Sequence, residues 1–205
     1  MIKELSSVAI YIRGSFFISL PVIEFCLTFR SKRTRTMHVL SSEVKDRHVT
    51  LEVLGDLKQL MAVRKRLYTE VETYAISYVE VYANNSVMKD EVLADRLSLV
   101  PFVTADPGDG VITLHVNKPG YVLSKELQSP LKLVYDDIAL VKLERGEEIN
   151  LKAHLTKGTS KMHMKWCILN NFTFKEREEG GFRVDIEHLG MVSSDLIVDM
   201  FRGVC

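Results

Sequence analysis

Apolar and polar positions alternate along several short segments of the chain, and this pattern predicts half-buried β-strands. The clearest alternation covers residues 48–54, and a second covers residues 76–83. Weaker versions follow at 111–116, 138–142 and 148–155. Successive side chains of a strand point to opposite faces of a sheet, so a period of two predicts sheets with one covered face.

The last part of the chain predicts a hairpin followed by a helix. Residues 172–175 and 182–186 are apolar-rich and flank a turn that contains glycine, which is typical of two antiparallel strands. A final helix is predicted from Ser194 onward, because Leu196 and Met200 recur at helical spacing.

Two further helices are predicted from apolar residues spaced three and four apart. The longer one covers residues 57–71, with Asp56 as its N-cap. The shorter one covers residues 89–99, has acids in its first turn and ends before Pro101. The stripe along the longer helix consists of Leu57, Leu60, Met61, Leu67, Tyr68 and Val71, interrupted by Arg64. Together these elements predict an α+β protein.

Charge and cysteine content narrow the function classes. The 205 residues include 27 Lys plus Arg and 27 Asp plus Glu, so the formal net charge is zero. A protein that binds nucleic acid alone usually carries a basic excess, because neutralising phosphate drives that binding. The three cysteines form no CxxC pair, which argues against a disulfide framework or a cysteine zinc site and favours a reducing compartment.

The first 47 residues are predicted to be an N-terminal extension. Residues 8–27 are strongly apolar, but Arg13, Pro21 and Glu24 interrupt them, so we expect packing onto the body and no membrane span. The basic segment 30–35 predicts a solvated linker, with an import signal or a phosphate contact as the alternative.

Motifs for catalysis and metal binding are missing from the sequence. There is no phosphate-binding glycine loop, no GxSxG elbow and no HExxH or HxH spacing, so no metal or cofactor is expected. The adjacent acids Asp136 and Asp137 are read as a solvated turn. The cluster His163, Lys165 and Trp166 has two interpretations, an anion or base-stacking site, or a loop in which Trp166 is buried and His163 caps a hydrogen bond. We favour the second.

Four segments, in order, resemble the alpha-like subunits of multisubunit DNA-dependent RNA polymerases. Residues 81–101 resemble a family signature that runs Asn-Asn-Thr-Ser, then Asp-Glu, then Ala-His-Arg, and ends in Pro. Residues 143–154 and 182–190 resemble two further segments, and Gly158 with residues 163–166 resembles Gly-x-x-x-x-His-Ala-Lys-Trp. The sequences Asn-Asn-Ser and Ile-Asn-Leu-Lys-Ala-His are most similar to those of the large alpha-like subunit shared by polymerases I and III.

The sequence departs from the family pattern at several positions. Glu72 stands where a proline is usual, Asp95 where a histidine is usual, and Ser98 where a glycine is usual. Met61 replaces an asparagine, and Cys167-Ile168 replaces Ser-Pro. The family normally ends in a long helix, whereas this sequence ends at Cys205, so the resemblance implies a reduced, divergent version.

The resemblance implies an alpha-like polymerase subunit fold. Residues 48–82 and 168–205 would form a discontinuous dimerisation domain, and residues 83–167 a mostly β insert. The chain would be a non-catalytic assembly subunit, located in the nucleus (nucleolus and nucleoplasm). It would pair with the small alpha-like subunit, and this pair would support the two largest subunits, so that DNA is met only through the complex.

The resemblance also assigns site residues. The interface with the small subunit is predicted at Leu60, Met61, Leu67, Val71, Leu196 and Met200. Contacts with the large subunits are predicted at Arg64, Lys65, His163, Lys165 and Trp166.

Other functions stay open at this point. The chain could be a polymerase II or archaeal-type alpha-like subunit. It could also be a free-standing nucleic-acid-binding protein that uses residues 30–35 with Lys165 and Trp166, or an enzyme that uses His163, Lys165 and Asp136.

Overall fold

A computed structural model describes residues 9–11 and 37–203 of the chain. Most of the apolar segment 8–27 and all of the basic segment 30–35 lie outside the described residues, so the predictions for them stay untested. No helix in the described part of the chain has the length and hydropathy of a membrane span.

The first sheet combines strands from both ends of the described chain. Its order is β2 (His38–Lys45), β3 (His48–Leu54), β10 (Phe182–His188) and β9 (Leu169–Glu176), all antiparallel. The hairpin predicted near the end of the chain is confirmed, with Phe182 opposite Glu176. On the inner face, Val49, Leu51 and Val53 are fully buried.

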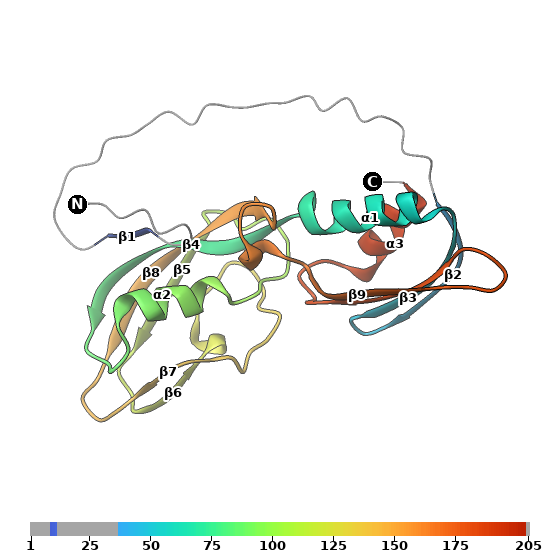
Figure 1. Cartoon of the computed structure of the whole chain (residues 1–205). Helices are drawn as coiled ribbons and strands as arrows, with labels where there is room; N and C mark the ends of the chain where they lie inside the picture. Colours follow the sequence, from blue (N-terminus) through green and yellow to red (C-terminus); the bar gives the residue numbers. More distant parts are fainter. Residues whose placement is uncertain (1–8, 12–36, 204–205) are drawn as a thin grey trace, which may run out of the picture.

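Two helices cover the inner face of this sheet (Figure 1). Helix α1 (Leu57–Thr69) begins as predicted at the N-cap Asp56, whose carboxylate accepts from Gln59 N at 2.7 Å while Gln59 Oε1 accepts from Asp56 N at 2.9 Å. Helix α3 (Ser194–Arg202) ends at Gly203, which has a φ of 71°.

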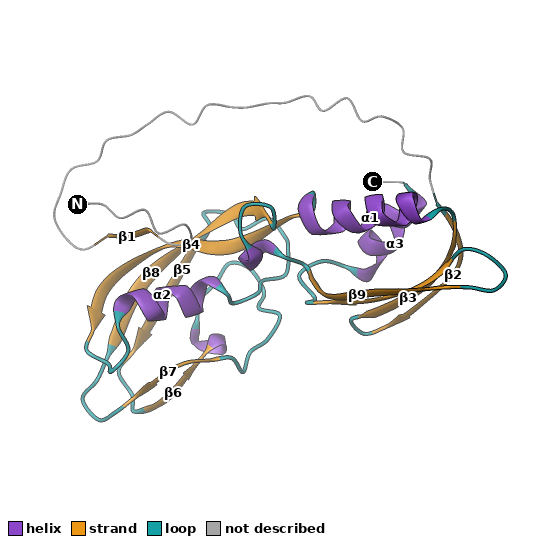
Figure 2. Cartoon of the chain, in the orientation of Figure 1, coloured by secondary structure: helices purple, strands orange, loops and turns teal. Residues whose placement is uncertain are grey.

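The second sheet has the order β1 (Ala9–Tyr11), β4 (Glu72–Asn84), β8 (Ile149–Thr159) and β5 (Val111–Val116). Helix α2 (Asp90–Ser98) contacts β4 and also β7 of a two-stranded sheet, β6 (Gly120–Leu123) with β7 (Ala139–Leu143), as Figure 2 shows. Two short 3-10 helices complete the fold, η1 (Ser124–Glu126) and η2 (Met164–Trp166). The predicted α+β class is confirmed.

Two separate hydrophobic cores divide the described residues into two lobes. The first lobe, residues 37–71 and 167–203, has a core that includes Leu51, Leu60 and Phe201. The second lobe, residues 72–166, has a core that includes Ile76 and Leu93.

Strands β2 and β4 belong to other parts of the fold than the domain division expected from the sequence assigns them to. Residues 38–45 were assigned to an extension, but they form β2, an exposed edge strand without clear alternation, paired to β3. Residues 72–82 were assigned to the dimerisation domain, but β4 pairs with β8, and Ile76 and Val79 pack into the second core. We therefore propose that the domain boundary lies near Val71 and not at residue 82.

Candidate functional site

Asn84, at the end of β4, fixes the loop that leads into α2. Its Nδ2 donates to Met88 O at 2.9 Å and to Asp90 Oδ1 at 2.7 Å. Its Oδ1 accepts from Ser86 N at 3.1 Å and from Ser86 Oγ at 2.7 Å. The amide of Asn84 is therefore fully used in shaping the Asn-Asn-Ser segment, and this segment has a structural role.

Asn85 joins this segment to the second segment of the resemblance. Its Oδ1 accepts from Glu148 N at 2.6 Å, and its backbone N donates to Glu148 O at 3.3 Å. From α2, Arg96 Nη2 donates to Ala139 O at 2.8 Å. Two segments more than forty residues apart are thus one hydrogen-bonded unit inside the second lobe.

Trp166 packs on Gly158, which explains the glycine in the third segment. Only 6% of Trp166 is exposed, and its Nε1 donates to Thr156 O at 3.1 Å. A Cβ atom at Gly158 would lie 2.5 Å from Cε2 of the indole ring, closer than side chains tolerate. The buried hydroxyl of Thr73 donates to Trp166 O at 3.0 Å, so this tryptophan is bonded to the start of β4 and to the end of β8.

Lys165 is buried beside Trp166. Its Nζ donates to Ile76 O at 3.1 Å and lies 4.4 Å from the centroid of the Trp166 ring. The register of β4 against β8 shifts between Ile76 and Tyr78, and such a bulge leaves a backbone group to be satisfied from elsewhere. Burial lowers the pKa of the Lys165 amino group.

The cluster at residues 163–166 matches the structural interpretation favoured from the sequence. Lys165 N donates to His163 Nδ1 at 3.1 Å, at the start of η2, and Trp166 is buried. Buried side chains offer little surface, so the large-subunit or base-stacking contacts expected of Lys165 and Trp166 lack the exposure they would need. In the same turn Met162 and Met164 are 68% and 65% exposed.

Helix α1 has two apolar faces where the sequence suggested one stripe. Leu60 and Leu67 are fully buried in the core of the first lobe, so they are not available to a partner as predicted. Leu57 is half exposed, and Met61 and Tyr68 are partly buried on the neighbouring face. An α-helix turns about 100° per residue. The buried pair and the partly exposed set differ by one or three positions in the sequence, so they point in different directions from the helix axis.

The basic residues predicted on α1 are on its surface. Arg64 is exposed, and its guanidinium lies 5.8 Å from the ring centroid of Tyr68 and 5.5 Å from that of Phe172. Lys65 is exposed as well. Both side chains are therefore accessible to another molecule.

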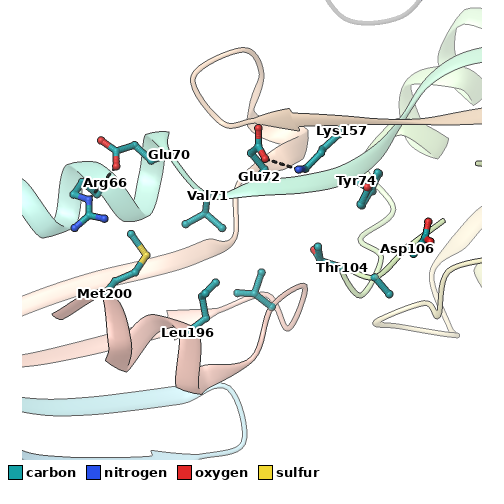
Figure 3. A pocket seen from close by; sticks show the side chains of 12 residues that line it. Arg66, Glu70, Val71, Glu72, Tyr74, Thr104, Asp106, Lys157, Leu196 and Met200 are labelled. Atoms are coloured by element: carbon teal, nitrogen blue, oxygen red, sulfur yellow. Dashed lines mark hydrogen bonds and ion pairs between the residues drawn. The ribbon is translucent and has the colours of Figure 1, made fainter. Parts of the chain in front are cut away.

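The other predicted interface residues line a cavity at the C-terminal end of α1. Val71, Leu196 and Met200 form part of the wall of this space of about 700 Å³, to which both lobes contribute (Figure 3). Figure 3 shows Thr104 of the second lobe across the space from Leu196 of α3. The full lining is Arg66, Glu70, Val71, Glu72, Tyr74, Thr104, Ala105, Asp106, Lys157, Val192, Leu196 and Met200.

His188 fastens the loop that follows β10. It is 4% exposed, its Nδ1 accepts from Gly190 N at 3.2 Å, and its Nε2 lies 2.9 Å from Ser194 Oγ. Because Nδ1 accepts, the neutral ring carries its proton on Nε2 and donates to Ser194. Burial lowers the pKa of His188, and the nearby charge of Arg47 lowers it further.

The remaining sequence candidates do not assemble into a catalytic group. Asp136 and Asp137 are exposed, as predicted for a solvated turn. Lys165 and Asp137 line a second space of about 500 Å³ that does not include His163 or Asp136. Among the described residues no cluster of three or more His, Cys, Asp or Glu could hold a metal ion.

Sequence reasoning missed the part of the cavity formed by residues 104–106 and by Val192. These residues lie in loops, where no periodicity marks a buried or lining position. One signal for the cavity was available in the sequence. The end of the helix at Val71 and the helix from Ser194 were both assigned to the same interface, and the fold brings these two segments together.

No protein-family model matches the chain. Three archaeal relatives are "DNA-directed RNA polymerase subunit Rpo3". The protein of Methanocaldococcus jannaschii is 32% identical over 145 residues, which cover 67% of this chain and 74% of the relative. That of Methanobrevibacter smithii is 32% identical over 72% of this chain and 61% of the relative, and that of Methanothermobacter thermautotrophicus is 34% identical over 63% and 58%.

All three relatives are subunits of DNA-directed RNA polymerase. The chain belongs to their family, the alpha-like polymerase subunit Rpo3. The matches span less than two thirds of the length of the second and third relatives.

Proposed function

We propose that the chain is a non-catalytic assembly subunit of a multisubunit DNA-directed RNA polymerase of archaeal type. It pairs with a small alpha-like subunit through the first lobe, and the pair supports the two largest subunits, which carry out RNA synthesis. The observation that carries this proposal is the 32% identity over 145 residues with an archaeal Rpo3 subunit.

The surface of the first lobe has an apolar face that favours binding of another protein. Leu57, Met61 and Tyr68 form a partly exposed apolar face on α1, and the space at Val71 and Leu196 continues it at the end of the helix. Apolar side chains grouped on a surface are typical of protein interfaces. We assign the partner interface to this face, and the exposed pair Arg64 and Lys65 to contacts with a large subunit.

The type of polymerase rests on different observations. The relatives named above are archaeal and favour the archaeal-type subunit. The subunit shared by polymerases I and III is the second candidate, because the amino-acid sequence of residues 84–86 and 149–154 resembles that subunit. The nuclear localisation expected with that reading remains a prediction.

Co-expression tests the proposal. The chain and the small alpha-like subunit from the same genome are expressed together, and an affinity tag is placed on the small subunit. We expect a stoichiometric heterodimer that binds the two largest subunits when these are added. Failure of the two small proteins to co-purify, while each remains folded by circular dichroism, would refute the proposal.

A further inference from the structure

The cavity beside α3 is built by both lobes. Val71, Leu196 and Met200 come from the first lobe, and Tyr74 and Thr104 come from the second (Figure 3). A volume of about 700 Å³ is in the range of clefts that bind a small ligand, and it leaves room for a bulky side chain of a partner. A molecule that enters this space therefore contacts both lobes at once.

The charges of the lining are largely paired with one another. Arg66 Nε lies 2.9 Å from Glu70 Oε2, and Lys157 Nζ lies 2.5 Å from Glu72 Oε2. Asp106, on an exposed loop, is the remaining charged residue of the lining. The pairing reduces the demand for a counter-charge, while the valine, leucine and methionine side chains favour apolar contact, so the space suits an uncharged occupant.

Thr104 adds one polar requirement. Its Oγ1 is buried, and it has no hydrogen-bond partner among the described residues. A buried polar atom without a partner costs free energy, and such atoms are uncommon in folded proteins. Because Thr104 lines the cavity, a hydrogen-bonding group on the occupant would remove that cost.

We propose that the cavity receives a bulky uncharged side chain with a hydrogen-bonding tip, tyrosine or tryptophan in character, from a helix of the small alpha-like subunit. This inference rests on the proposed function and adds that the partner bridges the two lobes. The cavity continues the partly exposed face of α1, so a helix lying along Met61 and Tyr68 reaches it at Val71. Aromatic side chains with one polar end are frequent anchors at such positions.

Three variants test this with the purified full-length chain and the purified small subunit. Ala105→Trp introduces an indole at the exposed rim of the cavity and leaves the core untouched. Leu196→Asp places a charge on its apolar wall. Thr104→Val removes the hydroxyl at nearly constant shape and leaves no unpaired oxygen, so it preserves the stability of the chain alone. Val87→Glu, at a residue 88% exposed and outside the cavity lining, is the control.

Isothermal titration calorimetry gives the affinities. We expect Ala105→Trp and Leu196→Asp to weaken binding at least about tenfold, and Thr104→Val to weaken it about five- to tenfold, as for one lost hydrogen bond. Val87→Glu should bind like wild type. Wild-type affinity in folded Ala105→Trp and Thr104→Val would overturn the inference and leave the heterodimer standing.

Two other outcomes would also overturn the inference. Absence of binding by the wild-type chain itself would overturn both the proposed function and this inference. Self-association of the chain that Ala105→Trp abolishes would assign the cavity to a second copy and overturn the assignment to the small subunit.

Discussion

Gly158 lies directly against the indole ring of Trp166, and a methyl group at Gly158 would come within 2.5 Å of the ring. The two residues belong to one sequence segment, which the fold closes on itself at the junction of the two lobes. The same turn supplies Lys165, whose amino group bonds to Ile76 O in the bulge of β4. The His-x-Lys-Trp group therefore has a structural role, because it holds η2 against the second sheet.

Replacing Gly158 by alanine should destabilise the chain by about 1–3 kcal/mol, because the added methyl group overpacks the site. The backbone and the buried indole have little room to move. Urea unfolding followed by tryptophan fluorescence and circular dichroism measures the effect.

A double-mutant cycle shows whether the ring is the cause. Leucine at position 166 lacks the ring atoms closest to Gly158, so Gly158→Ala should cost less in a Trp166→Leu background. Equal costs in both backgrounds would show that the contact with the indole is not responsible.

Asn84→Ala should loosen the start of α2. The substitution removes the amide that bonds to Met88 O and Asp90 and that accepts from Ser86, and we expect a loss of about 1–3 kcal/mol. Hydrogen exchange should quicken in residues 86–93. Asn171→Ala, at an exposed position of β9, serves as the matched control and should change stability by less than about 0.5 kcal/mol.

Acid should weaken the fold through His188. Its folded-state pKa is lowered from 6.5, so the unfolded chain takes up the proton first as pH falls. The stability that His188 contributes is therefore complete above about pH 6.5 and is lost as pH falls through the folded-state pKa. Protonation also removes the acceptor for Gly190 N.

The variant His188→Asn isolates this effect. Asparagine keeps an acceptor near the position of Nδ1 but does not titrate. The pH dependence of the unfolding free energy between about pH 5 and 7 should be shallower in the variant than in wild type. Parallel curves for the two proteins would assign the dependence to other groups.

Two neighbouring residues on α1 should respond differently to the same change. Leu60→Asp places a charge in the core of the first lobe and should cost about 4 kcal/mol or more, enough to unfold many domains. Met61→Asp lies on the partly exposed face, so the chain should stay folded while it loses affinity for the small subunit. Analytical gel filtration and circular dichroism separate the two effects. A folded Leu60→Asp chain would contradict the burial described above.

Strong periodicity predicted the elements well. The strand at residues 48–54 has the bounds expected, and the helix begins after Asp56 as expected, because alternation and a capping residue act locally. The helix ends at Thr69, two residues before the end predicted at Val71. Strand β2 was missed, since its residues lie at an exposed sheet edge and show no alternation. The lobe boundary differs from the one expected as well, because membership of β4 in one sheet or the other is decided by pairing with β8, whose residues follow far along the chain at 149–159.

The candidate site was harder to predict than the fold. A stripe of apolar residues cannot say which members face the chain's own core, so Leu60 and Leu67 were assigned to a partner although the sheet below them covers both. Val71, Leu196 and Met200 were assigned to the interface with the small subunit, and the sequence carried no signal for the cavity that they line or for its opposite wall at Thr104, which lies in a loop of the other lobe. The resemblance identified which segments matter, and the geometry showed that several of them serve the fold.

The most direct measurement of the central claim is purification of the tagged full-length chain from the cells that express it, followed by mass spectrometry and an RNA-synthesis assay. The account predicts that the two largest RNA polymerase subunits and a small alpha-like subunit co-purify in stoichiometric amounts, and that the complex synthesises RNA while the chain alone does not. Recovery of the folded chain without any polymerase subunit would contradict it.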